Sequence, residues 1–154
     1  MIFLHLLIFF CTFFLMEFMA WFTHKYVMHG FLWSLHKDHH QPEKGWFERN
    51  DTFFVFYALI STFLFMSWAE GWFDYGLSMG LGILFYGIAY FAVHDVFIHR
   101  RLNWFKHSDH PYFKAIRKAH KIHHKHRNKE DGECFGMLVV PLKYYKEAKS
   151  SSKR

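Results

Sequence analysis

The arrangement of histidines constrains this chain more than any other feature of its sequence. The spacing H-x4-H followed by H-x2-H-H occurs twice, and the two copies hold ten of the chain's 14 histidines. Neutral imidazole is the commonest metal ligand, and it suits iron, copper, zinc and nickel better than it suits the hard cations. The two matched sets therefore indicate metal binding, and the predicted ligands are His24, His29, His36, His39, His40, His94, His99, His120, His123 and His124.

The triplet in each copy suits an α-helix. Positions i, i+3 and i+4 share one face of a helix, so His36, His39 and His40 can converge, and the second triplet can do the same. The H-x4-H pairs fit less well, because five residues turn a regular helix by about 140° and splay the two rings. Two explanations stay open: each ring of a pair serves a different metal, or a local π-bulge brings the rings together.

The composition indicates an integral membrane protein with an all-α fold. Hydrophobic residues make up 52% and aromatic residues 23% of the 154 positions, which is too apolar for a small soluble domain. Apolar runs predict three spanning helices, at residues 2–22, 52–69 and 75–93. The first run lacks the basic start and the cleavage site of a signal peptide, so we interpret it as a membrane anchor.

The polar parts of the chain are predicted in less detail. We interpret Pro111 as a helix breaker that precedes a helix over residues 112–127. The apolar stretch 134–142 is too short to span the membrane. We therefore expect a single domain over residues 1–142, followed by a basic, disordered tail over residues 143–154.

The positive charge lies on one side of the predicted membrane topology. The net charge is +6, and all 19 Lys and Arg residues fall within residues 25–49 or 100–154, beside the two histidine sets. The positive-inside rule assigns these regions to the cytoplasm, which explains the charge without nucleic acid. Two spans separate the histidine sets, so both are predicted to lie on that one face as a histidine-rich metal cap.

Other kinds of cofactor site are excluded by missing motifs. Cys11 and Cys134 are the only cysteines and no C-x-x-C occurs, which excludes a disulfide framework, an iron–sulfur cluster and a thiolate zinc site. No G-x-G-x-x-G or Walker sequence marks a nucleotide site. Ten imidazoles exceed what one metal holds, so two metals are expected, with electrons supplied by a separate protein.

Three carboxylates are candidates to support the ligands from outside the metal's own shell. A ligating imidazole usually donates its other N–H to such a group. Asp38 lies between two predicted ligands and Asp95 beside another, although either can simply be a solvated helix charge. Glu17 lies inside a predicted span, where an ionisable group is costly. We predict no catalytic side chain beyond the metal centre.

The histidine motifs HKYVMH, HKDHH, HDVFIH and HKIHH are similar to the four motifs of the fatty acid hydroxylase superfamily of membrane di-iron oxygenases. Within it, the longer stretches HGFLW, P-x-x-G-x-FE-x-ND and KE…FG resemble the bacterial non-haem β-carotene 3-hydroxylases. The resemblance covers roughly residues 17–142. All the motif histidines of the family are present in this chain.

The resemblance implies two iron ions that use O2 to insert oxygen at C3 of each β-ionone ring. The lipid-soluble carotenoid β-carotene would become β-cryptoxanthin and then zeaxanthin, with electrons from a ferredoxin and its reductase. All ten repeated histidines would be iron ligands or lie close to the irons. The implied architecture is a helical bundle of three or four spanning helices in the bacterial inner membrane, surrounded by membrane lipid.

Two other functions stay open at this point. A hydroxylase or desaturase of the same superfamily, acting on a fatty acyl or sterol substrate, has the same histidine spacing. From a different class, a membrane electron carrier can hold a metal or haem between paired histidines on its helices.

Overall fold

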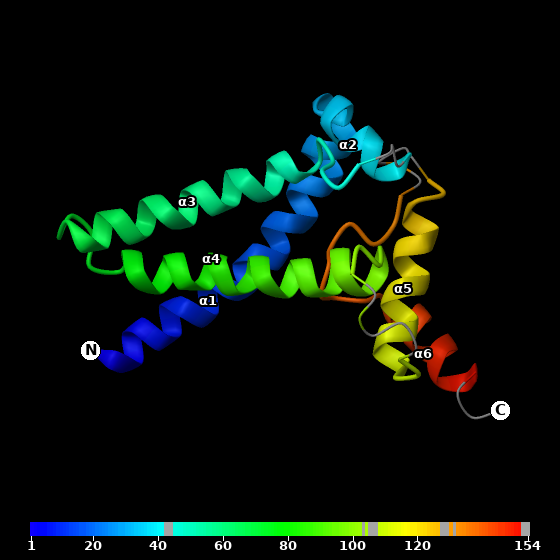
Figure 1. Ribbon diagram of the computed structural model, residues 1–154. Helices are drawn as coiled ribbons and strands as arrows, with labels where there is room; N and C mark the ends of the chain where they lie inside the picture. Colours follow the sequence, from blue (N-terminus) through cyan, green and yellow to red (C-terminus); the bar gives the residue numbers. More distant parts are fainter. Residues whose placement is uncertain (42–44, 103, 105–107, 127–129, 131, 152–154) are drawn as a thin grey trace. The chain divides into compact units, whose positions relative to one another are not determined.

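The computed structural model describes residues 1–154 except 42–44, 103, 105–107, 127–129, 131 and 152–154. In chain order the elements are α1 (Ile2–Phe22), η1 (Thr23–Phe31), α2 (Trp33–His40), α3 (Asp51–Ala69), α4 (Gly76–Phe91), η2 (Ala92–Ile98), α5 (Pro111–His123) and α6 (Leu142–Ser151), where η denotes a π-helix (Figure 1). The described residues contain helices and no strand, so the all-α prediction is confirmed.

Three helices are long and apolar enough to cross a membrane. They are Ile2–Phe31, Asp51–Ala69 and Gly76–Ile98, each of which contains or overlaps one predicted span. Two of them run past the predicted ends because the π-helices η1 and η2 continue α1 and α4. The prediction of three spans is therefore confirmed for the part of the chain that the structure describes.

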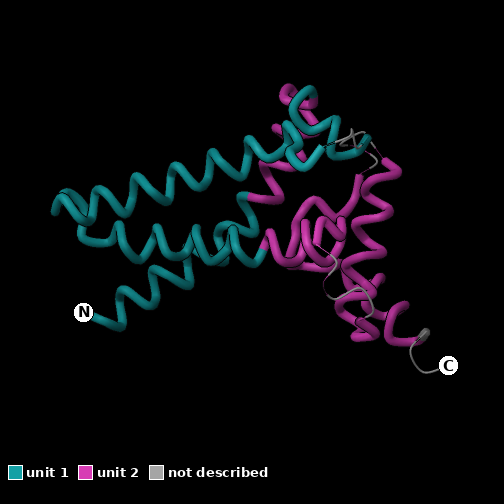
Figure 2. The backbone as a smooth tube through the Cα atoms, in the orientation of Figure 1, with its two compact units in different colours: residues 1–19, 34–89 teal, residues 20–33, 90–154 magenta. Residues whose placement is uncertain are grey.

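The chain divides into two compact units, shown in Figure 2. Unit 1 comprises residues 1–19 and 34–89, and it holds most of the three apolar helices together with α2. Unit 2 comprises residues 20–33 and 90–154, and it holds η1, η2, α5 and α6.

In unit 1, small residues let the apolar helices pack closely. α3 and α4 lie side by side (Figure 1), and a Cβ atom added to Gly80 of α4 would lie 2.6 Å from the Phe65 ring of α3. A Cβ atom added to Gly82 would lie 2.7 Å from Thr12 Cβ of α1. The Ser61 hydroxyl donates to the Gly80 carbonyl at 2.8 Å. Small-residue packing and polar bonds of this kind hold membrane helices together.

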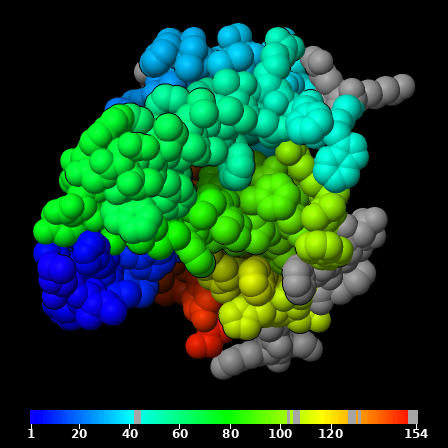
Figure 3. Space-filling view, turned by 60° about the vertical axis from the view of Figure 1, so that its left-hand side comes forward, coloured from blue at the N-terminus to red at the C-terminus, as the bar shows by residue number. Residues whose placement is uncertain are grey.

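The outer surface of α3 is apolar. Figure 3 shows this surface in teal to green. Phe56 is 57% exposed, Leu59 64% and Phe63 62%. These large apolar side chains are unfavourable in water, and a hydrocarbon environment removes that cost.

In unit 2, α5 and α6 pack against each other through small side chains. Ala115 and Ala119 of α5 meet Tyr144 and Ala148 of α6 in a buried cluster. α5 begins at Pro111, which is favourable because the first helical position needs no N–H donor. The predicted helix over 112–127 is therefore corrected at both ends: Pro111 starts it, and its helical residues end at His123.

The predicted tail also needs correction. Residues 143–154 were expected to be disordered, but α6 covers Leu142–Ser151. Its Tyr144 is only 3% exposed, and Lys118 of α5 forms a 2.5 Å ion pair with Glu147. Packing against α5 supplies stabilisation that the polar α6 sequence does not have by itself.

Candidate metal centre

The two H-x4-H pairs are associated with π-helices: His24 and His29 lie within η1, and His94 lies in η2 with His99 directly after its last residue. In a π-helix the backbone hydrogen bond joins residues i and i+5, and the His99 N–H donates to the His94 carbonyl at 2.9 Å. The ring centroids of these two histidines are 4.6 Å apart, and those of His24 and His29 are 5.2 Å apart. The splay expected on a regular helix is thus absent. Of the two explanations left open, the π-bulge is confirmed.

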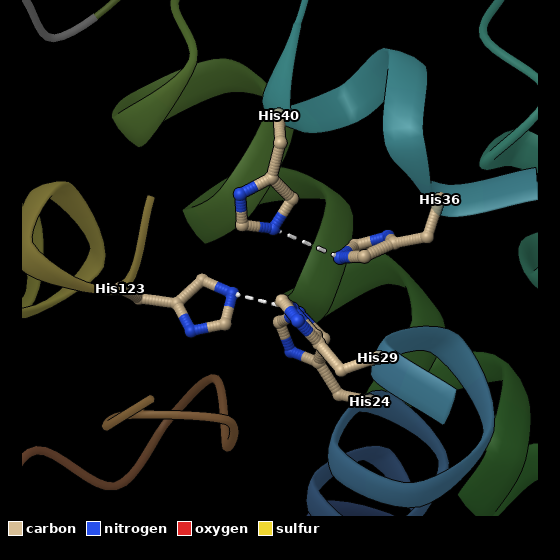
Figure 4. Close-up of side chains that lie close together, drawn as sticks. All are labelled: His24, His29, His36, His40 and His123. Atoms are coloured by element: carbon tan, nitrogen blue, oxygen red, sulfur yellow. Dashed lines mark hydrogen bonds between the residues drawn. The ribbon is translucent and has the colours of Figure 1, made fainter. Parts of the chain in front are cut away.

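One group of histidines in unit 2 combines η1 with the end of α5. A nitrogen atom from each of His24, His29 and His123 lies within 4.8 Å of the other two. Figure 4 shows His24 and His29 projecting from one helix toward His123, with a dashed line where Nε2 of His29 and Nε2 of His123 lie 3.2 Å apart. All three side chains are buried, and the Phe135 ring lies against each of them.

A second group in unit 2 combines η2 with the same end of α5. Nε2 of His120 lies 2.8 Å from Nε2 of His99 and 2.8 Å from Nε2 of His124. The His94 ring is 4.9 Å from the His120 ring, between centroids. The last turn of α5 thus contributes His123 to the first group and His120 to the second, and the C-cap residue His124 also joins the second.

The first triplet belongs to unit 1, where His36 and His40 come together on α2 while His39 does not join their group. Nε2 of His36 and Nε2 of His40 lie 3.2 Å apart on α2, a contact also drawn in Figure 4. The ring of His39 stacks 5.2 Å from that of His36. His36 and His39 are almost fully buried, which removes them from competing water.

Several histidines donate their Nδ1–H to an acceptor. This leaves the Nε2 lone pair available to bind a metal. This pattern is typical of metal-bound histidine, since the outer hydrogen bond fixes the tautomer and the orientation of the ring. The Nδ1 donors and their acceptors are His24 to the Phe135 carbonyl (3.0 Å), His123 to the Glu133 carbonyl (3.0 Å), His36 to Asn50 Oδ1 (2.7 Å), His39 to Glu48 Oε2 (2.9 Å) and His94 to Asp95 Oδ2 (3.1 Å).

Burial and neighbouring imidazoles within unit 2 keep His120 and His124 neutral. Burial lowers the pKa of His120 well below its usual value, and the neighbouring His94 lowers it further. Burial, with His94 and His29 nearby, lowers the pKa of His124 to about 4. Neutral imidazole is the form that binds metal, so both side chains are ready to ligate at neutral pH.

The spacing of the nitrogen atoms fits a metal. Imidazole nitrogen binds a metal such as zinc at about 2.0–2.1 Å, so two ligands at right angles lie about 3 Å apart. The Nε2–Nε2 separations within the two units are 2.8–3.2 Å. The described side chains therefore suit a soft or borderline transition metal bound by imidazole.

Of the three predicted carboxylate supports, Asp95 has the clearest role. Its Oδ2 accepts from His94 Nδ1 at 3.1 Å, and its Oδ1 lies 3.2 Å from the Arg101 guanidinium. The arginine holds the carboxylate in place while the carboxylate orients the imidazole. Asp95 therefore contacts a predicted ligand, and its supporting role at a metal stays a prediction.

The other two candidates make different contacts. Asp38 is buried, and its Oδ2 accepts from the backbone N–H of Arg49 at 2.5 Å. Glu17 accepts from the Tyr86 hydroxyl at 2.7 Å, between α1 and α4. Neither of these contacts joins the carboxylate to a histidine, so a supporting role for either carboxylate stays a prediction.

Sequence reasoning missed the acceptors that lie outside the histidine motifs. Glu48 and Asn50 carry a visible signal, since they are polar residues just before an apolar helix, but nothing in the sequence pairs them with particular histidines. The other two acceptors are the backbone carbonyls of Glu133 and Phe135, which do not depend on the kind of side chain and so cannot be found from the sequence. Cys134 between them has φ +60°, a conformation unfavourable for a non-glycine residue, which is typical of backbone held in place at a functional site.

Comparison with known proteins identifies the family. The fatty acid hydroxylase family matches residues 9–142, which include every histidine described above. The chain belongs to the fatty acid hydroxylase family. Members of this family are typically iron-dependent, in agreement with the imidazole-rich groups.

Similar proteins with curated names are named for one substrate, β-carotene. The chain is 39% identical over 135 residues to the β-carotene hydroxylase of Pantoea ananas, covering 88% of this chain and 77% of the relative. It is 37% identical over 132 residues to that of Pseudescherichia vulneris, covering 81% and 70%. A chloroplastic β-carotene 3-hydroxylase of Arabidopsis thaliana is 36% identical over 132 residues, covering 82% of this chain and 41% of the plant protein. No solved structure matches the chain.

The resemblance seen in the sequence is therefore confirmed. The bacterial relatives align over most of both chains, so the similarity extends well beyond the histidine motifs.

Proposed function

We propose that this chain is a β-carotene 3-hydroxylase. It inserts one atom of O2 at C3 of each β-ionone ring and converts β-carotene through β-cryptoxanthin to zeaxanthin. Similarity to β-carotene hydroxylases over 88% of the chain is the observation that carries this assignment. The histidine groups within each unit are the proposed metal-binding sites for this reaction.

The proposed cofactor is a pair of iron ions. When bound, the irons supply the reduction of O2 and the cleavage of a strong C–H bond, chemistry that no side chain here can perform. Pairwise Nε2 separations near 3 Å support metal binding in both units. The proposed ligands are the ten repeated histidines, His24, His29, His36, His39, His40, His94, His99, His120, His123 and His124.

The protein's own residues have three tasks. Acceptors on Nδ1 keep Nε2 free of its proton, as in the bond from His123 to the Glu133 carbonyl. Burial excludes water and keeps the imidazoles neutral, as for His124. The apolar helices give a substrate that dissolves in hydrocarbon a route to the ends of the spans, where η1 and η2 carry ligands.

Each hydroxylation also consumes two electrons and two protons and releases one water. The chain carries no flavin, haem-attachment or nucleotide motif, so we assign the electrons to an external donor such as ferredoxin with its reductase. We place the protein in the bacterial inner membrane as a multi-pass protein. The basic flanks support a cytoplasmic location for the histidine sets.

The test is pigment chromatography of a bacterial host that accumulates β-carotene. The host expresses this chain, its His124→Ala variant, or a His126→Ala control that changes an exposed histidine outside the repeated sets. We expect zeaxanthin and β-cryptoxanthin with the unaltered chain and the control, and unchanged β-carotene with His124→Ala. Unchanged β-carotene in every strain, with the protein shown to be in the membrane, contradicts the carotenoid assignment and directs the search to acyl and sterol lipids.

A further inference from the structure

In unit 1, α2 is hydrogen-bonded to a short loop that precedes α3. We call residues 48–50 the acceptor loop. The two segments run past each other in opposite directions, so the later residues of α2 meet the earlier residues of the loop. The three contacts are His39 Nδ1 to Glu48 Oε2 at 2.9 Å, Asp38 Oδ2 to the Arg49 N–H at 2.5 Å, and His36 Nδ1 to Asn50 Oδ1 at 2.7 Å.

Asn50 departs from its usual role at a helix start. It occupies the N-cap position of α3, where an asparagine side chain normally accepts from the first backbone N–H groups of the helix. No such bond forms, and its Oδ1 accepts from His36. A residue that breaks a local rule in this way usually serves a functional site.

Asp38 fixes the middle of the acceptor loop. Its side chain is 6% exposed, and burying a carboxylate is costly unless it is hydrogen-bonded. By accepting from the Arg49 N–H, it holds the backbone between Glu48 and Asn50. The two acceptors are thereby kept at the spacing of the two histidines.

The loop is also fixed at its other end. Asp51 Oδ2 accepts from the Glu48 N–H at 3.1 Å, and the Asp51 N–H donates to the Glu48 carbonyl at 3.0 Å. α3 begins at Asp51. The backbone of Glu48 is therefore held at the start of α3, so its carboxylate reaches His39 from a fixed point of the loop.

We propose that Glu48 and Asn50 are positioning residues that set the tautomers of His39 and His36. This proposal rests on the metal centre proposed above. A neutral imidazole carries one N–H, and an acceptor at Nδ1 places it there, which leaves the Nε2 lone pair for the metal. Without the acceptor, a second tautomer puts the proton on the ligating atom. Glu48 also brings a negative charge, which makes His39 a stronger donor to the metal than His36.

The test measures iron binding rather than turnover. The full-length protein is purified in detergent, stripped of metal and titrated with Fe²⁺ without oxygen, with affinity read from bound iron. Glu48→Ala and Asn50→Ala remove the acceptors, whereas Glu48→Gln and Asn50→Asp keep an acceptor oxygen. Glu70→Ala is the control, since it removes an exposed carboxylate of the same unit after α3.

We expect the two alanine variants to bind Fe²⁺ about 10–100-fold more weakly, the usual cost of losing such a support. Asn50→Asp should recover most of the affinity. Glu48→Gln should recover only part, because it restores the acceptor without the charge. Glu70→Ala should bind like the unaltered protein.

A purely structural loop gives a different pattern. Lower thermal stability of the metal-free alanine variants with unchanged Fe²⁺ affinity overturns the positioning role and leaves the proposed function intact. Equal losses in the alanine variants and their conservative partners also overturn it. If the unaltered protein binds no iron, the metal centre of the proposed function fails, and the role of the loop fails with it.

Discussion

The Tyr86 hydroxyl donates a 2.7 Å hydrogen bond to Glu17 Oε2. Tyr86 is 2% exposed on α4 and Glu17 lies on α1, so the bond joins two apolar helices of unit 1. An ionisable group inside a span is costly, and a hydrogen bond from a neighbouring helix offsets part of that cost.

The energy of this bond can be measured with a double-mutant cycle. Tyr86→Phe should destabilise the protein, because Glu17 loses this donor, and the same change should cost less in a Glu17→Leu background. We expect a coupling of about 0.6–1.7 kcal/mol, the range between the mean and the maximum for such bonds in membranes. Unfolding in SDS, followed by circular dichroism, provides the measurement. Additive losses mean that the two side chains stabilise the helices independently.

Gly82 should tolerate no side chain. In Gly82→Ala the new Cβ would lie 2.7 Å from Thr12 Cβ and 2.9 Å from the Phe9 carbonyl, so α1 and α4 must separate. We expect about 1–3 kcal/mol of destabilisation, typical of overpacking. The control is Gly87→Ala, whose Cβ would make an ordinary 3.6 Å contact with Phe54. SDS unfolding midpoints should fall for the first variant only, and equal midpoints contradict the packing described here.

Removing the metal should affect both activity and stability. Stripping iron with 2,2′-bipyridine should abolish β-carotene hydroxylation, and Fe²⁺ should restore it where Mg²⁺ does not, because imidazoles suit transition metals. A ligand at 100 times its Kd stabilises a protein by about 2.7 kcal/mol, so the thermal midpoint should also drop. Full hydroxylation by protein whose iron content has been measured as zero would count against the proposed centre.

The thiol of Cys134 should resist alkylation. Burial first, and the Glu133 carboxylate second, raise its pKa from 9.0 to about 11. Both effects disfavour the thiolate, so at pH 8 only about one thiol in a thousand is ionised, against about one in ten at a pKa of 9.0.

In a Cys11→Ser background, the rate of reaction with iodoacetamide should therefore rise about tenfold per pH unit up to pH 10. The same protein unfolded in SDS should level off near pH 9. A plateau near pH 9 in the folded protein would show that the thiol is not shielded.

The spanning helices were predictable because lipid selects long apolar runs, and such runs are visible in one sequence. The bounds of α1, Ile2–Phe22, match the first predicted run. α3 begins at Asp51, one residue before the second predicted run, 52–69. α6 was missed because its stability depends on packing between Tyr144 and α5. That contact joins segments about twenty residues apart, and no local pattern reports it.

The metal centre was predictable in part for a similar reason. Histidine spacing shows which rings can share a helix face, but it does not decide between an α-helical and a π-helical turn. The bonds from His36 to Asn50 and from His39 to Glu48 depend on how a loop folds back on α2. Backbone acceptors such as the Glu133 carbonyl are present at every position, so sequence cannot single them out.

The two π-helical segments also limit how the length of this chain can vary during evolution. Loops tolerate gained or lost residues because their ends stay in place. A deletion within η1 or η2 would force the turn from i, i+5 back to i, i+4 hydrogen bonding, and an insertion would break the i, i+5 bond that brings the two rings of each pair together. Insertions and deletions in this lineage should therefore accumulate between the histidine motifs and not inside them.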